Sequence, residues 1–215
     1  MAPTFQTLAV VGRLLPDLKR RPGKFPAWPR RLKFVLLLLF LFVFLLPCLQ
    51  AQEARPTDVE VQAAYLFNFG KFVRWPLSED AQSNLLPLNI CVLGKSSFGS
   101  VLDSTVRGET IDGRPVVAKT IPSLQDAASC RIVFISASEE GRLGAILPAL
   151  RHQGILTVSN IPHFTDRGGM IEFVNFDDRI RFAVNLVPLR EAGLSVSSEL
   201  LKVAIRVIGQ MGRQR

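Results

Sequence analysis

The segment with the clearest fold signal runs from Ile132 to Val158 and has the sequence IVFISASEEGRLGAILPALRHQGILTV. It begins with four consecutive apolar residues, which are typical of a strand that is covered on both faces. A helix is predicted over Glu139–His152, because apolar residues recur at helical spacing between Leu143 and Leu150. A second apolar strand follows at Ile155–Val158. This succession of strand, helix and strand predicts a βαβ unit with parallel strands.

The segments on the amino-terminal side extend this pattern. Thr57 and Glu60 have the spacing of a capping box, in which each side chain accepts a hydrogen bond from the other residue's backbone N–H. We therefore expect a helix that opens near Pro56 and stops at Trp75-Pro76. A buried strand, a short helix and a second strand are predicted to follow (Leu88–Leu93, Phe98–Thr105 and Val116–Ala118).

On the carboxyl-terminal side the pattern changes to an antiparallel hairpin. Its strands are predicted over Met170–Val174 and Arg179–Asn185, with Asn175–Asp178 as the connection. Large apolar residues alternate with arginine or alanine along the second strand, which predicts one buried and one solvated face. A last helix is expected over Ser198–Ile208. The sequence thus predicts a mixed α/β fold with a mostly parallel sheet, flanking helices and a carboxyl-terminal antiparallel hairpin.

The positive charge of the chain is concentrated near its amino terminus. The formal net charge is +8. Residues 1–50 hold eight of the 26 Lys and Arg residues and one of the 18 acids, which leaves 18 basic and 17 acidic residues in 51–215. Because residues 51–215 are nearly neutral, nucleic-acid binding driven by net charge is excluded.

The same amino-terminal residues have the pattern of an export signal. A basic n-region, residues 1–33, precedes the uncharged apolar h-region 34–46. These thirteen apolar residues suit a signal peptide and fall short of the roughly 17–25 that a membrane span needs. Cleavage is predicted after Ala51, so that 1–51 is the signal peptide and 52–215 is the exported α/β domain. An uncleaved membrane anchor is the alternative.

Signals for catalysis and for metal binding are poor. Asn89–Ser96 approaches the spacing of a nucleotide-binding P-loop, but it lacks the first glycine and is itself mostly a hydrophobic strand. The two histidines, His152 and His163, have no cysteine or carboxylate at metal-ligand spacing. No nucleophile is paired with a base. We therefore expect no enzymatic activity, no cofactor and no metal.

Two cysteines, Cys91 and Cys130, remain after removal of the signal. An even number of cysteines in an exported protein favours a disulfide. Closing a loop of about 39 residues would stabilise the fold by about 4 kcal/mol. Two buried free thiols are the alternative, because both cysteines lie in or beside predicted core strands.

Short segments spread over nearly the whole exported domain form an ordered series. They are Ala63–Pro76, Ile90–Gly94, Gly113–Val116, Cys130–Ser136, Leu156–Ser159, Phe164, Gly168–Ile171, Arg179–Phe182, Asn185 and Ala192–Ser198. In this order they resemble the YfiR-like family. The resemblance implies a periplasmic α/β domain without catalytic activity. The best-understood members tend to be dimeric, bind the periplasmic region of a membrane-bound diguanylate cyclase and lower its cyclic-di-GMP output, until envelope or redox stress relieves the restraint.

The resemblance also bears on the cysteines. Cys91 and Cys130 match the family's cysteine pair, which favours the disulfide. Some relatives have a second pair that flanks the double-glycine turn. This chain carries Thr165 and Glu172 at those positions and so lacks the second disulfide.

A regulatory protein needs exposed apolar or aromatic anchors for its partner. Phe176 at the hairpin tip, with Arg179 and Arg181 on the solvated face, is the predicted partner-binding site. We expect a homodimeric regulator of a membrane-bound diguanylate cyclase or another sensor protein. The alternative is a periplasmic protein that binds a small ligand at the carboxyl ends of the parallel strands, near Gly94–Ser97 and Ser136–Ser138.

Overall fold

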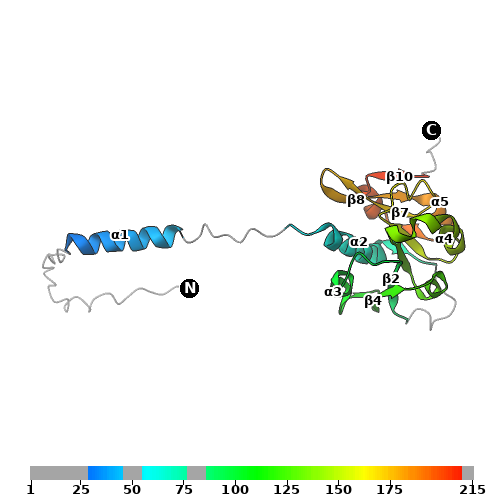
Figure 1. Cartoon of the computed structure of the whole chain (residues 1–215), viewed down its shortest axis with the longest axis horizontal. Helices are drawn as coiled ribbons and strands as arrows, with labels where there is room; N and C mark the ends of the chain where they lie inside the picture. Colours follow the sequence, from blue (N-terminus) through cyan, green and yellow to red (C-terminus); the bar gives the residue numbers. More distant parts are fainter. Residues whose placement is uncertain (1–28, 46–54, 77–85, 210–215) are drawn as a thin grey trace, which may run out of the picture. The chain divides into compact units, whose positions relative to one another are not determined.

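The computed structural model of the chain describes residues 29–45, 55–76 and 86–209. Most of the predicted n-region, the end of the h-region and the predicted cleavage site after Ala51 lie outside these residues. The chain divides into two compact units, Met1–Glu53 and Ala54–Arg215 (Figure 1).

In the first unit the structure describes helix α1 (Arg30–Leu45), which coincides with most of the predicted h-region. None of the helices in the described part of the chain is long and apolar enough to span a bilayer.

The second unit is built around an eight-stranded sheet. Its strands are β2 (Leu88–Leu93), β3 (Thr110–Ile111), β4 (Arg114–Ile121), β5 (Ile132–Ile135), β6 (Leu156–Ser159), β7 (Ile171–Phe176), β8 (Arg179–Asn185) and β10 (Arg206–Ile208). They lie in the order β10-β8-β7-β6-β5-β2-β4-β3. The neighbours from β7 to β4 are parallel, as are β10 and β8, whereas β7–β8 and β3–β4 are antiparallel. The predicted fold class is confirmed.

Helices cover both faces of this sheet (Figure 1). They are α2 (Asp58–Phe72), α3 (Val101–Val106), α4 (Leu143–Leu150), α5 (Leu186–Glu191) and α6 (Ser198–Val203), with 3₁₀ helices η3 (Leu124–Ser129) and η4 (Ala137–Arg142). Successive residues of a strand point to opposite faces. Accordingly, Ile90 and Val92 of β2 belong to the hydrophobic cluster that includes α2, whereas Cys91 and Leu93 belong to the cluster that includes α4.

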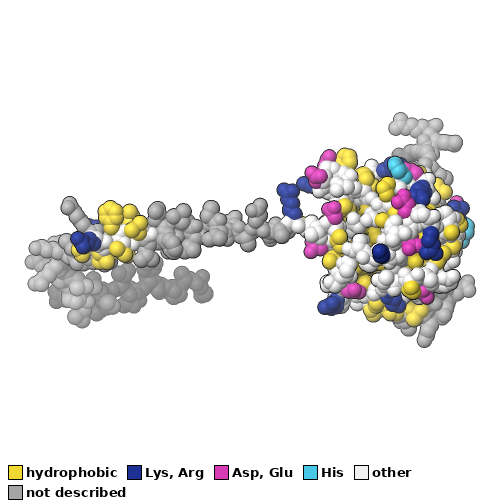
Figure 2. All heavy atoms as spheres, viewed as in Figure 1, with side chains coloured by type: hydrophobic (Ala, Val, Ile, Leu, Met, Phe, Trp, Pro, Cys, Tyr) yellow, Lys and Arg dark blue, Asp and Glu magenta, His cyan; other side chains and the backbone are white. Residues whose placement is uncertain are grey.

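The surface of the second unit agrees with its nearly neutral composition. On the face that Figure 2 shows, acidic and basic side chains are interspersed, and no large field of one sign is visible. This arrangement fits the exclusion of binding driven by net charge alone.

Helix α2 begins as the sequence predicts. The hydroxyl of Thr57 accepts a hydrogen bond from the Glu60 N–H, and the Glu60 carboxylate accepts one from the Thr57 N–H at 2.7 Å. The helix ends at Phe72, earlier than predicted, because the next two residues form strand β1 (Val73–Arg74). This strand pairs with β9 (Ser195–Val196) in a separate small sheet.

Removing the Thr57 hydroxyl should destabilise the fold measurably. We expect Thr57→Ala to lower the free energy of unfolding by about 1 kcal/mol, because a free backbone N–H at the start of α2 loses its acceptor. Ser100 precedes α3 but makes no capping hydrogen bond through its side chain, so Ser100→Ala is a matched control with little expected effect. Denaturant unfolding of both variants checks the difference, and equal losses would contradict the capping role.

Two helix predictions are wrong in part. The segment predicted as one helix over Glu139–His152 is divided into η4 and α4, and η4 is tied to the end of β2 because Ser138 Oγ accepts a hydrogen bond from the Lys95 N–H. The predicted last helix, Ser198–Ile208, stops at Val203. The chain then becomes β10, which satisfies backbone groups on the outer edge of β8.

The hairpin between β7 and β8 is tighter than predicted. Its turn consists of Asp177 and Asp178, which both have positive φ, at 50° and 53°. A two-residue turn with positive φ at both positions matches the right-handed twist of the flanking strands, and Asp tolerates this conformation better than most residues. Phe176 therefore lies in β7 itself rather than in the connection, and Ala183 on the predicted wet face is buried.

Candidate partner-binding surface

The hairpin places the three predicted partner-binding residues on one face. Phe176 pairs directly with Arg179, and Val174 pairs with Arg181. Because paired residues and residues two apart share a face, the side chains of Phe176, Arg179 and Arg181 project to the same side. The structure thus brings together the three residues that the sequence predicted to bind a partner.

These three side chains form an unpaired aromatic and cationic patch. The exposed fraction of Phe176 is 55%, Arg179 is exposed and Arg181 is half-buried. Within the described residues, neither guanidinium makes a hydrogen bond or an ion pair, and the Phe176 ring has no aromatic neighbour. The patch is therefore available for contacts with another molecule.

A groove of about 390 Å³ lies beside this patch, between the first turns of α2 and the beginning of β8. Its lining residues are Arg55, Pro56, Asp58, Val61, Tyr65, Asp178, Arg179, Ile180 and Arg181. Strand β10 pairs with the Ala183–Asn185 part of β8. In the described part of the chain, Arg179–Arg181 therefore has no strand on its outer side, and an open edge of this kind can pair with an extended segment. Sequence reasoning missed this groove, because it depends on where β10 begins beside β8.

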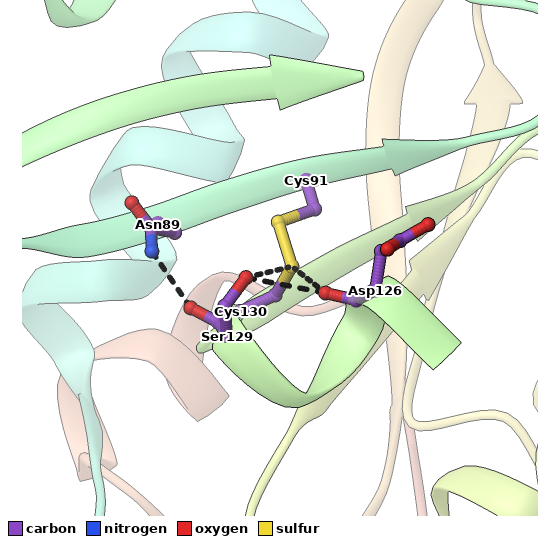
Figure 3. Close-up of a disulfide and its surroundings, with 5 residues drawn as sticks. All are labelled: Asn89, Cys91, Asp126, Ser129 and Cys130. Carbon is purple, nitrogen blue, oxygen red and sulfur yellow. Dashed lines mark hydrogen bonds between the residues drawn. A yellow bond between two sulfur atoms is a disulfide. The ribbon is translucent and has the colours of Figure 1, made fainter. Parts of the chain in front are cut away.

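Cys91 and Cys130 are joined by a disulfide (Figure 3), with their Cα atoms 5.9 Å apart. Cys91 is at the centre of β2, and Cys130 follows η3, so the bond fastens η3 onto the sheet. Beside it, the amide nitrogen of Asn89 donates a hydrogen bond of 2.7 Å to the carbonyl of Ser129. Both cysteines are buried.

The structure does not support a ligand pocket at the carboxyl ends of the parallel strands. The two loops that would line it are bonded directly to each other, because Lys95 N–H donates to Ser138 Oγ at 2.9 Å and Ser136 Oγ donates to the Lys95 carbonyl at 2.6 Å. A hollow beside Ser96 encloses about 70 Å³. Ligand pockets usually enclose on the order of 300–1,000 Å³.

A polar network connects Thr165 and Glu172, the two buried residues predicted from the sequence to stand at the positions of a second cysteine pair. The Glu172 carboxylate accepts hydrogen bonds from the His163 N–H at 2.9 Å, the Thr165 N–H at 3.1 Å and the Thr165 hydroxyl at 2.7 Å. Arg206 of β10 donates to the Thr165 hydroxyl at 2.8 Å and pairs with Asp166 at 3.0 Å. Polar contacts thus connect the double-glycine loop, β7 and β10.

The hydrogen bonds from Arg206 hold the pKa of the Asp166 carboxyl below its ordinary value. A lowered pKa means that this pair stabilises the folded state above the ordinary pKa of an aspartate, about 4, and that the contribution is lost as the pH falls through the lowered value. The Arg206–Asp166 pair therefore contributes fully at neutral pH. Sequence reasoning missed it, because Arg206 was placed in a helix.

Metal-binding side chains do not gather in the described part of the chain. No group of three or more His, Cys, Asp or Glu residues there has a geometry that could hold an ion. His163 lies in the loop, where its Nδ1 is 3.5 Å from an oxygen of Asp166.

The chain is similar to a family of proteins and, remotely, to solved structures. No curated protein is significantly similar to the chain. Among solved structures, it is similar to a conserved domain protein of Vibrio cholerae O1 biovar El Tor (10% identity, TM-score 0.43) over 55% of this chain and 54% of the other. It is also similar to an ABC domain of Streptococcus pneumoniae in complex with L-Trp (13% identity, TM-score 0.44), over 68% and 60%. The chain thus spans less than two thirds of either protein. The sequence model of a family described as YfiR/HmsC-like matches residues 59–205.

Proposed function

The chain belongs to the YfiR/HmsC-like family, and from this premise we propose that it is a non-catalytic periplasmic regulator that binds the periplasmic part of a membrane signalling protein. The family as a whole is associated with regulation of diguanylate cyclase signalling. We propose that the partner of this chain is a membrane-bound diguanylate cyclase, which the bound regulator restrains, so that less cyclic-di-GMP is made.

The observation that carries this proposal is the patch formed by Phe176, Arg179 and Arg181. Aromatic residues and arginines dominate the binding energy of protein interfaces, because they combine a large contact area with directed polar groups. Here Phe176 and Arg179 are exposed, Arg181 is half-buried, and none of the three side chains has a polar or aromatic partner within the described residues. A buried or internally paired set would instead stabilise the domain itself.

The groove beside the patch indicates how a partner could bind. The outer edge of β8 at Arg179–Arg181 can accept backbone hydrogen bonds from an extended segment. Val61 and Tyr65 of α2 provide an apolar wall for alternate side chains of that segment. An extended periplasmic segment of the partner, lying along β8, fits this geometry.

We also propose that the domain is exported and forms a homodimer. Residues 1–51 act as the signal that directs the domain 52–215 to the periplasm, and the exported domain acts as a homodimer. A soluble regulator of this kind needs no catalytic group, which agrees with the poor catalytic signals of the sequence.

Replacing the aromatic anchor should weaken partner binding. We expect Phe176→Asp to lower the affinity for the partner at least about tenfold, because a charged carboxylate replaces a large apolar contact at a hot-spot position. The measurement is capture of membrane proteins by the immobilised domain, with the captured diguanylate cyclase identified by mass spectrometry. Cellular cyclic-di-GMP should rise in the same variant.

Val203→Asp is the matched control, because the exposed fraction of Val203 is 57% and it lies in α6 rather than in the hairpin. The control should bind as the unaltered domain does, and both variants should unfold at similar temperatures. If Phe176→Asp binds the partner with unchanged affinity, the hairpin is not the interface.

A further inference from the structure

A second hollow lies at the amino-terminal edge of the parallel strands, at the opposite end of the sheet from the loops that contain Lys95 and Ser136. It encloses about 450 Å³. The residues that line it come from the starts of β2 and β5, from both halves of β4, from η3 and from the turn after α4: Leu86, Pro87, Asn89, Arg114, Lys119, Ala128, Ser129, Cys130, Arg131 and Gln153. Its size is that of a small-molecule site.

The lining of this hollow is cationic. It includes Arg114, Lys119 and Arg131, whereas none of the described residues that line it is acidic. None of the three makes an ion pair within the described residues. Since residues 51–215 are almost neutral in sum, three cations in one hollow are a local concentration of charge that favours an anion, even though the negative charge of Asp112 near Arg114 offsets part of it.

Arg114 is fixed in this position. Its Nε donates to the Leu86 carbonyl at 2.7 Å, and Nη2 donates to the Pro87 carbonyl at 3.4 Å. Burial, and next the positive charge of Arg131, lower the pKa of the Arg114 guanidinium. Both causes disfavour the positive charge, the negative charge of Asp112 opposes them, and a bound anion would offset the cost further.

Asn89 adds an unpaired polar atom. Its Nδ2 donates to the carbonyl of Ser129, which can only accept, so the other end of the amide is the oxygen Oδ1 (Figure 3). The Oδ1 is buried and accepts no hydrogen bond from the described residues. A buried acceptor without a donor is costly, and an occupant that carries a hydroxyl could supply the donor after a small shift of the amide.

The wall that contains Ser129 and Cys130 is rigid. The disulfide ties Cys130 to Cys91 in β2, and the Cys130 N–H donates to the Ala127 carbonyl at 2.9 Å. A rigid wall keeps the entropy lost on binding small, so that the polar groups do not have to be ordered when a ligand enters.

We propose that this hollow binds a small phosphate-bearing anion. The dianion of phosphate carries two negative charges for the cationic lining and one hydroxyl for Asn89. The three cations provide charge-assisted hydrogen bonds to its oxygens, which are stronger than neutral ones. This site is separate from the hairpin, so it does not depend on the proposed regulatory function.

Titration calorimetry with inorganic phosphate tests the site. The protein is the Ala54–Arg215 unit, which contains both hydrophobic clusters. At low ionic strength and mildly alkaline pH, one phosphate should bind per chain. Arg131→Gln should weaken binding at least about tenfold, because one charge-assisted hydrogen bond is lost. Lys119→Gln should also weaken phosphate binding, and it tests the site if Arg131→Gln does not fold.

Arg107→Gln is the matched control, because Arg107 is exposed, lies outside the hollow and changes the net charge by the same amount. It should leave the affinity unchanged. Absence of saturable binding, or equal weakening by Arg107→Gln and Arg131→Gln, would overturn the proposal. Sulfate has the charge of the phosphate dianion but no hydroxyl, so it should bind more weakly. Equal affinity for the two anions would overturn the assignment of phosphate.

Discussion

Replacing both cysteines, in the double variant Cys91→Ala and Cys130→Ala, is expected to lower the free energy of unfolding by about 4 kcal/mol. The disulfide closes a loop with a sequence separation of 39 residues, and the open chain gains the conformational freedom that the cross-link removes from the unfolded state. Because the bond also fastens η3 to the sheet, its loss should free the segment around Ser129 first. Denaturant unfolding of the double variant and of the unaltered domain measures the difference.

A reductant provides the control for this prediction. It should shift the unfolding midpoint of the unaltered domain to that of the double variant, and it should leave the double variant unchanged. Both sulfurs are buried, so reduction should be slow until the domain unfolds. The disulfide is refuted if alkylation of the unaltered domain, denatured without reductant, labels two thiols.

The second large effect is expected at Glu172. We expect Glu172→Ala to lower the free energy of unfolding by about 3 kcal/mol, because the backbone N–H groups of His163 and Thr165 and the Thr165 hydroxyl lose their acceptor. Thr165 is buried, so water does not readily replace the carboxylate. Arg206 should also become more mobile, which would loosen β10 at the edge of the sheet. Thermal unfolding and hydrogen exchange at Thr165 and in β10 measure the two effects.

Glu140→Ala is the matched control for the loss of a carboxylate. Glu140 is exposed and pairs with Arg167 at 3.2 Å, and pairs of this kind contribute little to stability. Its replacement should change the free energy of unfolding by less than about 1 kcal/mol. If the two variants lose the same stability, the buried network does not hold the loop in place.

The network also bears on how this member of the family is held together. Relatives with a second cysteine pair would close the double-glycine loop covalently, whereas this chain closes it through Glu172 and Thr165. A reductant does not affect these hydrogen bonds or the Arg206–Asp166 ion pair, and the ion pair responds to pH instead. The disulfide at Cys91 is thus the covalent tie between segments in the described part of the domain.

Local patterns in the sequence were sufficient for much of the fold. The apolar runs Leu88–Leu93 and Ile132–Ile135 have the strand boundaries that the sequence predicted, and the capping box at Thr57 starts α2. Arg179 and Arg181 also share a face, as the side-chain period of a strand predicts. Phe176, which was expected in the connection, joins that face because β7 extends to it.

The carboxyl-terminal segment was predicted less well, for a physical reason. Apolar residues from Leu200 to Ile208 fit helical spacing, and α6 indeed begins there. The segment then leaves the helix, because the outer edge of β8 offers backbone partners, such as the Phe182 carbonyl that accepts the Ile205 N–H at 3.0 Å. Tertiary pairing overrides local periodicity, and no short window of sequence contains both partners.

The sequence by itself determined the α/β class, the order of the elements around the parallel strands and the absence of a strongly basic domain. These properties depend on composition and on spacings within single elements. The tertiary structure alone decided where β8 remains open, which groups surround Glu172, and that Arg114, Lys119 and Arg131 meet in one hollow. Those features arise from contacts between residues far apart along the chain, such as Asn89 and Ser129, and only packing of the folded chain brings such residues together.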